Sequence, residues 1–244
     1  MCGFSQRDSR GDGKIAANQL SGLLYLGAKK MRLRAVKTIG AISRHSLKLA
    51  LPLLTLGLAG CGYYDSTPDP ALSARDSEYL ALAPKAEINP EFGRYLVDDP
   101  TGQPPGTIVV NTKTHLLYYV LPKKKAIRYG IATGAGAYGW TGVASVGRKQ
   151  EWPHWMPPAD MVERWPHLQP TANAGGLPGG PENPLGARAL YLFQGNKDTL
   201  YRIHGTNEPD KIGQAVSSGC IRMRNIDAID LYNRVKLGTR VVVE

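Results

Sequence analysis

The sequence predicts a mainly β domain that contains one short helix and one long irregular segment. Short apolar runs rich in β-branched and aromatic residues recur from residue 106 onwards, and turn residues separate them. Only the stretch that follows residue 225 has the apolar spacing of an amphipathic helix. Many strands with few helices favour a sheet-based fold with a single apolar core.

The domain is expected to open with a hairpin and a third strand. Residues 107–111 and 115–121 read as the two arms, with a turn between them. A Lys-rich turn at 122–125 leads into an apolar strand at 126–133. The stretch that follows, 134–147, is rich in glycine. No Gly-Lys-Ser/Thr follows it and no helix opens there, so a nucleotide-binding loop is not indicated.

Residues 151–184 are expected to form an irregular lid or groove wall, because ordered domains seldom keep so long a loop without a use. Three of the four tryptophans lie here. Aromatic side chains with a polar edge suit a glycan strand or a peptide, so we place Trp152 and Trp155 among the substrate contacts, with Tyr138 from the preceding loop. The alternative, that these tryptophans simply cover the sheet, is equally consistent with the sequence.

The end of the chain is predicted to be strand, loop, helix and strand. Residues 200–204 form a strand that ends at His204. Asn225 is a suitable helix N-cap, and Asp227 falls in the first turn, where a negative charge favours the helix dipole. Residues 240–243 form the closing strand.

The formal net charge of +10 is concentrated in the first quarter of the 244-residue chain. Residues 1–60 carry 10 Lys and Arg against 2 Asp and Glu, and the remainder carries 20 against 18. A nucleic-acid partner would require a basic patch on the folded domain, so the charge distribution argues against one.

Residues 1–60 are interpreted as a leader and lipoprotein-type signal peptide, with Met31 as the expected start. A basic region precedes the apolar run 49–59, which is too short to span a membrane. The ending Leu-Ala-Gly-Cys resembles the bacterial lipobox, in which the cysteine, here Cys61, is acylated. An ordinary signal peptide that happens to end in cysteine is the alternative. Gly62 stands where Asp would favour the inner membrane, so we expect a periplasmic protein anchored at the outer membrane.

Residues 61–105, rich in Pro and Ala, are expected to be a tether, and residues 106–244 the folded domain. Within the tether we expect at most a short helix, and one edge strand at residues 95–97. After processing, only Cys61 and Cys220 remain, so Cys220 should lack a disulfide partner. No Cys or His spacing offers a metal site.

Cys220 and His204 form a candidate nucleophilic pair. A thiol attacks well only as the thiolate, and a nearby imidazole can take its proton. Gly219 has no side chain, so a substrate carbonyl can approach the backbone there, and its amide is a candidate oxyanion donor.

The motif around this pair resembles the signature of the bacterial L,D-transpeptidase family. The matching positions are His204, Ser217, Gly219, Cys220, Ile221, Arg222 and Asn225. Ser218 departs from the family, which usually has a second histidine there that supports the catalytic one. The resemblance covers residues 106–244 and implies a β-sandwich-like catalytic domain.

By this resemblance, Cys220 attacks a peptidoglycan stem peptide and forms a thioester, and His204 transfers the proton. Ser218 would support His204, and Arg222 would order the loop or contact the substrate. An amine acceptor, on a second stem or an envelope protein, would then resolve the thioester, without cofactor or metal. Two alternatives stay open: a hydrolase that uses the same pair with water, and a non-catalytic wall-binding lipoprotein.

Overall fold

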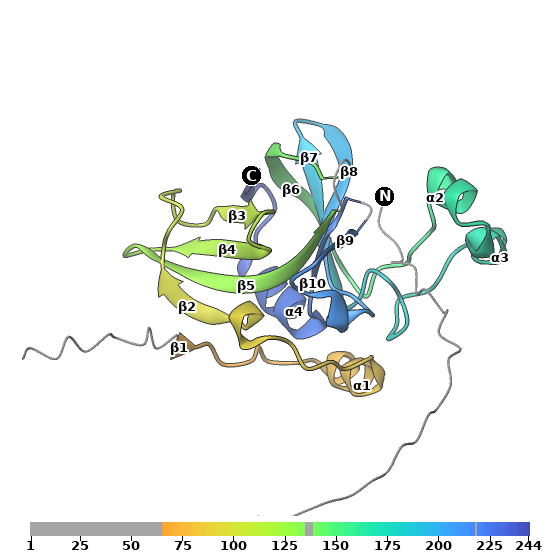
Figure 1. Ribbon diagram of the computed structural model, residues 1–244, viewed down its shortest axis with the longest axis horizontal. Helices are drawn as coiled ribbons and strands as arrows, with labels where there is room; N and C mark the ends of the chain where they lie inside the picture. Colours follow the sequence, from red (N-terminus) through yellow and green to blue (C-terminus); the bar gives the residue numbers. More distant parts are fainter. Residues whose placement is uncertain (1–64, 135–138, 218) are drawn as a thin grey trace, which may run out of the picture. The chain divides into compact units, whose positions relative to one another are not determined.

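The computed structural model describes residues 65–134, 139–217 and 219–244 (Figure 1). Several sequence predictions lie outside the described residues: the signal at 1–60, Cys61, Tyr138 and Ser218. The described part is mainly β, which confirms the predicted class. Its strands are β1 (Asp65–Ser66), β2 (Tyr95–Asp98), β3 (Ile108–Asn111), β4 (Leu116–Leu121), β5 (Lys125–Gly134), β6 (Gly142–Glu151), β7 (Arg188–Gln194), β8 (Lys197–His204), β9 (Ala215–Ser217), β10 (Ile221–Met223) and β11 (Arg240–Val243).

Within the described residues the strands form one sheet that closes on itself. Its order is β1-β2-β5-β10-β8-β7-β6-β11-β3-β4, and β4 also pairs with β5. The short strand β9 pairs with β5 beside this path. The predicted hairpin is confirmed, because β3 and β4 pair antiparallel from Ile108 opposite Tyr119 to Asn111 opposite Leu116.

The second half of the Gly-rich stretch 134–147 belongs to a strand that the sequence did not predict. Strand β6 begins at Gly142 and pairs with both β11 and β7. Its exposed face carries Arg148 and other polar residues, and its pairing with β7 shifts register between Val146 and Arg148. Glycines and this bulge hide the apolar alternation that identifies a strand in sequence.

The apolar core lies inside the closed sheet and is completed by helix α4 (Asn225–Arg234). Strands β3, β5, β6, β7 and β8 supply most of it, and α4 with the residue after it adds Ala228, Leu231 and Val235. The N-cap position of this helix is Arg224, whose side chain makes no capping hydrogen bond, so the prediction that Asn225 is the N-cap is wrong by one residue. Asp227 does lie in the first turn, where it is fully buried and pairs with Arg224 and Arg94.

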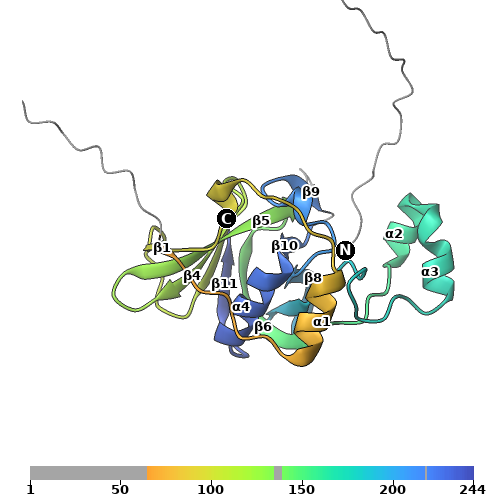
Figure 2. The ribbon, with the colours of Figure 1, turned by 90° about the horizontal axis from the view of Figure 1, so that it is seen from below.

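The described part of the predicted tether is folded onto the domain. Helix α1 (Ala74–Leu82) and the 3-10 turn η1 (Pro90–Phe92) precede β2, which pairs with β5. Asp76 of α1 is buried and receives hydrogen bonds from Arg188 and from the indole of Trp152. Figure 2 shows α1 beside α4, and Tyr79 of α1 packs against a cluster that contains Ile229 of α4. The short helix and the edge strand expected in this segment are confirmed as α1 and β2, but both pack onto the domain, so residues 65–105 are not a free tether.

The irregular segment between β6 and β7 carries short helical turns that project away from the sheet in Figure 1. These are α2 (Ala159–Arg164), η3 (Pro166–Leu168) and α3 (Gln169–Asn173); a further turn, η4 (Pro209–Lys211), follows β8. At the base of this segment, Trp155 and Leu177 form an isolated β-bridge. The side chain of Asn183 donates to the carbonyls of Pro153 and Pro178 and accepts from the amide of Leu185. In the part of the chain that is described, no helix has the length and apolarity of a membrane span.

Candidate active site

Strands β8 and β10 bring His204 and Cys220 to the same face of the sheet. The two strands are parallel neighbours, with Ile203 opposite Ile221 and His204 opposite Arg222. Ile203 and Ile221 both point into the core, so His204 and the residues on either side of Ile221 point to the other face. Cys220 is thus a diagonal neighbour of His204 on the adjacent chain segment, a position for which backbone atoms are roughly 7–8 Å apart.

The imidazole of His204 is held in the tautomer that a base requires. Nδ1 lies 2.6 Å from the carbonyl oxygen of Gly205, which can only accept a hydrogen bond, so Nδ1 carries the proton. Nε2 then keeps its lone pair. It is buried, and it has no hydrogen-bond partner among the described residues. Burial and the nearby charge of Arg222 lower the pKa of His204 to about 3, so the ring is neutral at pH 7.

Arg222 is part of the frame of the site rather than a substrate contact. It is 2% exposed, and its guanidinium donates to Glu208 at 2.8 Å in a buried ion pair. The predicted contact between Arg222 and substrate is therefore not supported by its burial. Its position opposite His204 instead lets its charge hold the imidazole in the neutral form.

The side chain of Ser217 holds the loop before β10. Its hydrogen bonds also engage the amide of Gly219, which was predicted to hold an oxyanion. The hydroxyl of Ser217 donates to the carbonyl of Cys220 at 2.5 Å and accepts from the amide of Gly219 at 3.2 Å. The Gly219 amide would have to leave Ser217 before it could hold an oxyanion. Gly219 has φ 128°, which favours glycine at this position.

Cys220 is fully buried, and its sulfur is disulfide-bonded. The expectation of an unpaired thiol concerned the processed chain, in which Cys61 carries lipid, and it stays a prediction. The other two cysteines of the chain, Cys2 and Cys61, lie outside the described residues. A nucleophile must be a free thiolate, so the form of Cys220 that could attack a substrate is the reduced one.

Asn225 joins the His204 loop to the start of β7. Its side-chain oxygen accepts hydrogen bonds from the amides of Ala187 (2.9 Å) and Thr206 (3.1 Å), which explains why it does not cap α4. A Cβ atom on Gly205 would lie 2.2 Å from this oxygen, and one on Gly186 would lie 2.1 Å from it. Both glycines are therefore required if the hydrogen bonds of Asn225 are to hold the loop that follows His204.

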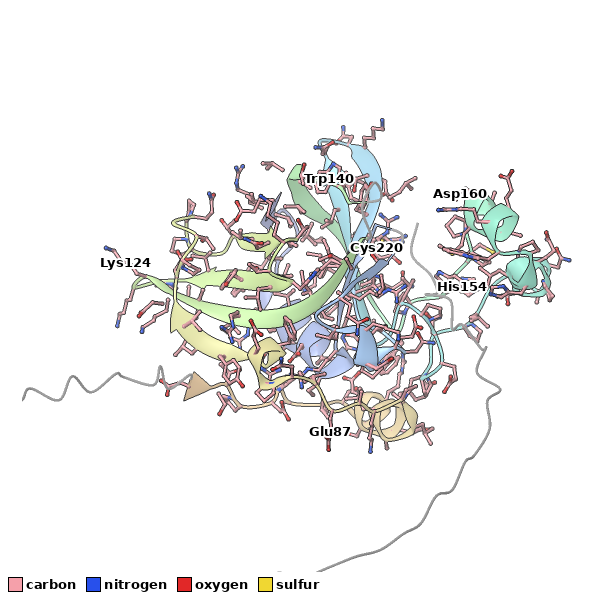
Figure 3. All side chains as sticks on the ribbon, in the orientation of Figure 1. Glu87, Lys124, Trp140, His154, Asp160 and Cys220 are labelled. Carbon is pink, nitrogen blue, oxygen red and sulfur yellow. The ribbon has the colours of Figure 1, made fainter. Side chains whose placement is uncertain are left out.

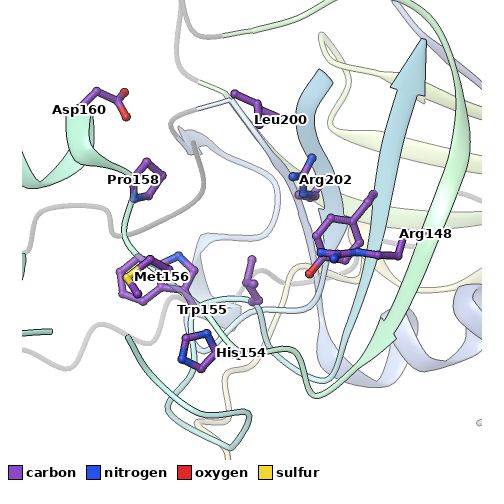
Figure 4. A pocket seen from close by; sticks show the side chains of 10 residues that line it. Arg148, His154, Trp155, Met156, Pro158, Asp160, Leu200 and Arg202 are labelled. Atoms are coloured by element: carbon purple, nitrogen blue, oxygen red, sulfur yellow. The ribbon is translucent and has the colours of Figure 1, made fainter. Parts of the chain in front are cut away.

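A cavity of about 300 Å³ lies next to the apolar cluster that contains Cys220, although Cys220 and His204 do not line it. Trp155 and Leu185, which line it, belong to the same apolar cluster as Cys220, and the carbonyl of Leu200 lies 3.9 Å from Sγ. In Figure 4, Arg148 and Arg202 form one wall, and Trp155, Met156, Pro158 and Asp160 lie across from them. Figure 3 likewise places Cys220 on the side of the sheet nearest His154 and Asp160. The irregular segment is thus a wall of this cavity.

The two tryptophans predicted to contact substrate differ in position. Trp155 lines the cavity, although it is only 3% exposed. Trp152 is buried against Tyr79, with ring centroids 4.8 Å apart, and its indole donates to Asp76 at 2.8 Å. Trp152 therefore covers the sheet and anchors α1, which is the alternative that the sequence left open.

A family model for the L,D-transpeptidase catalytic domain matches residues 105–243. The chain belongs to this family. The His204 and Cys220 segments both fall within the match. Among the described residues, no group of three His, Cys, Asp or Glu side chains could hold a metal ion.

Relatives of this L,D-transpeptidase domain include two curated proteins from Escherichia coli K12. Probable L,D-transpeptidase ErfK/SrfK is 37% identical over 56% of this chain and 43% of its own length. Probable L,D-transpeptidase YbiS is 39% identical over 55% and 43%. The chain thus spans less than half the length of these relatives. A solved structure described as a probable carnitine operon oxidoreductase, from Brucella melitensis, is 51% identical over 64% of this chain and 96% of its own, with a TM-score of 0.44.

Sequence reasoning missed three residues of the L,D-transpeptidase cavity, namely Arg148, Tyr191 and Arg202. Each lies in a strand and outside the motif, and the strand that carries Arg148 was not predicted. Their alignment follows from the register of β6, β7 and β8, which only the structure gives.

Proposed function

We propose that this chain is an L,D-transpeptidase that acts on peptidoglycan stem peptides through a thioester on Cys220. The observation that carries the proposal is the unpartnered Nε2 of a neutral, buried His204 on the strand next to the cysteine. Family membership supports the reaction class. The cavity lined by Trp155 and Leu185, which share an apolar cluster with Cys220, supplies room for a peptide.

The reaction begins from the reduced protein. As Sγ of Cys220 bonds to the carbonyl carbon of the L-centre that precedes the terminal D-residue, the thiol proton passes to Nε2 of His204. The charges that develop on the two groups stabilise each other, which offsets the low basicity of a buried imidazole. His204 then protonates the leaving amine, the C–N bond breaks, and a thioester remains.

The second half of the reaction reverses these roles. An amine of the acceptor attacks the thioester carbonyl, gives its proton to His204, and expels the Cys220 thiolate, which recovers the proton. A diaminopimelate side chain or an amine of an envelope protein fits this step. Backbone amides near Cys220 would hold the oxyanion, with Gly219 released from Ser217 if its amide takes part.

Cys220→Ala should abolish both acylation and cross-linking. We expect the reduced wild-type full chain to gain the mass of one carbapenem molecule and to join two purified stem peptides, and the variant to do neither. Unfolding curves and circular dichroism of the variant check that it still folds. A variant that forms cross-linked product would disprove the mechanism. Release of the terminal D-residue without amine incorporation would instead assign the chain as a hydrolase, and no adduct on wild type would favour a wall-binding protein.

We further propose that the protein acts in the periplasm, attached to the outer membrane by lipid on Cys61. The support is the lipobox-like ending of the leader and the glycine that follows it. Cys61→Ala should move the protein from the membrane fraction of cells to the soluble envelope fraction. Unchanged membrane association of this variant, or failure of the wild type to incorporate labelled fatty acid, would contradict the anchor.

A further inference from the structure

Four side chains line up across adjacent segments of the sheet and end at the sulfur. Arg148 on β6 pairs with Tyr191 on β7, and Tyr191 pairs with Arg202 on β8. The register of β8 with β10, continued by one residue beyond Ile221, sets Cys220 beside Arg202. This row shares the face of His204, because Arg202 and His204 are two residues apart on one strand. Three of its members, Arg148, Tyr191 and Arg202, line the cavity described above.

The row is positively charged, and only one of its guanidinium groups is neutralised. Both guanidinium carbons lie over the Tyr191 ring, that of Arg148 at 3.7 Å and that of Arg202 at 4.5 Å from the centroid. Arg202 makes a two-point ion pair with Asp198, at 2.7 and 2.9 Å. Arg148 is exposed and makes no ion pair with any described residue.

The opposite wall of the cavity does not supply the missing negative charge. Asp160 lies there, but its carboxylate is paired with Arg164 at 2.7 Å. Burial raises the pKa of Asp198, but hydrogen bonds from Arg202 and Leu200 and the charges of Arg202 and Arg148 hold it below its usual value. Of these two arginines, only Arg202 lies within ion-pair distance of the ionised carboxylate. The cavity thus presents a flat cation, oriented by an aromatic ring, with an open hydrogen-bonding edge.

We propose that Arg148 binds a carboxylate of the donor peptide. This inference rests on the proposed function and names a specificity residue for it. A guanidinium recognises a carboxylate through two parallel hydrogen bonds, and stacking on Tyr191 orders the group beforehand.

The position of Arg148 selects which carboxylate it takes. The backbone of Arg148 is three strand spacings from that of Cys220, about 14 Å. The terminal carboxylate of the residue that leaves is only about one residue, or 3.8 Å, beyond the scissile carbonyl. The proposed ligand is therefore a carboxylate on a side branch of the donor, such as the far end of a diaminopimelate residue.

The test compares donors that differ in one carboxylate. Initial rates of D-residue release are measured for the reduced full chain with a diaminopimelate stem, with the same stem amidated on the side branch, and with the stem amidated at its terminus. Side-branch amidation should lower kcat/KM of the wild type about tenfold, mainly through KM. Arg148→Gln should show the same loss with the free donor and no further loss on side-branch amidation. Arg240→Gln, at an exposed arginine of β11 that lies outside this cavity, is the matched control and should behave as wild type.

Two results would overturn the inference. One is equal activity of Arg148→Gln and wild type on all donors, or an equal fractional loss by the variant on all of them. The other is a loss that tracks terminal rather than side-branch amidation. Calorimetric binding of each stem to full-length Cys220→Ala, with and without Arg148→Gln, separates the subsite from the reaction. Binding that depends on Arg148 without any turnover by wild type would reject the proposed function and keep the subsite.

Discussion

His204→Gln is expected to lower the rate of Cys220 acylation by about 10²- to 10⁴-fold, the range for loss of a general base. Glutamine can still donate to the Gly205 carbonyl, but it cannot accept the thiol proton. The measurement is the rate of carbapenem adduct formation on the reduced protein, followed by mass spectrometry. His167→Gln, at an exposed histidine of η3, is the matched control and should keep the wild-type rate.

The pH profile of the wild type follows from the same imidazole. Because burial and Arg222 lower its pKa to about 3, His204 stays unprotonated as the pH falls from 7 to 5. The acylation rate should therefore show no decline centred near pH 6.5, where an exposed histidine would take up its proton. A decline at that pH, absent from His204→Gln, would mean that the imidazole is solvated in the reduced protein. An unchanged rate in His204→Gln would remove His204 from the mechanism.

The site could be predicted from sequence because its chemistry is local. His204, Ser217, Gly219 and Cys220 lie in one short stretch, and their residue types alone indicate a nucleophile and a base. The roles of Arg222 and Asn225 could not be assigned in this way. Each depends on partners that the strand register and loop packing bring close, such as Glu208 for Arg222 and Ala187 for Asn225.

The fold class was predictable where strands alternate clearly and was not predictable elsewhere. Strand β6 (Gly142–Glu151) carries two glycines and a polar outer face, so its composition resembles that of a loop. Because the strand was not predicted, the stacking of Arg148 on Tyr191 could not be predicted either.

The segment before residue 106 was misread for a different physical reason. Its composition buries few apolar residues, which is typical of a tether. Its attachment instead comes from two buried ion pairs, Asp76 with Arg188 and Arg94 with Asp227. The partners in each pair are more than 100 residues apart, with separations of 112 and 133, so no local pattern reveals them.

Asp76→Ala is accordingly expected to lower the free energy of unfolding by about 3–5 kcal/mol, the cost of leaving one member of a buried ion pair alone. The Arg188 side chain is 5% exposed, and it donates to both oxygens of Asp76 at 2.8 Å. The mutation also leaves the Trp152 indole without its acceptor. Denaturant unfolding of the full chain measures the loss. Asp98→Ala removes an exposed ion pair with Lys125 and serves as control, with an expected loss of no more than about 1 kcal/mol.

A double variant separates the ion pair from simple loss of packing. In Asp76→Leu/Arg188→Met both charges are gone and apolar volume replaces them, so much of the lost stability should return. If Asp76→Ala unfolds at the wild-type denaturant concentration, α1 does not stabilise the catalytic domain and residues 65–105 act as a tether after all.

The same ion pair is connected to His204, the proposed base, through the backbone of Arg188. Arg188 begins β7, the strand that pairs with β8, and its carbonyl accepts a hydrogen bond of 2.9 Å from the amide of Gly205, next to His204. Loosening α1 should therefore slow acylation of Cys220 as well as destabilise the fold, and the double variant should recover both. Wild-type acylation rates in a destabilised Asp76→Ala would show instead that Arg188 holds its backbone position without the carboxylate.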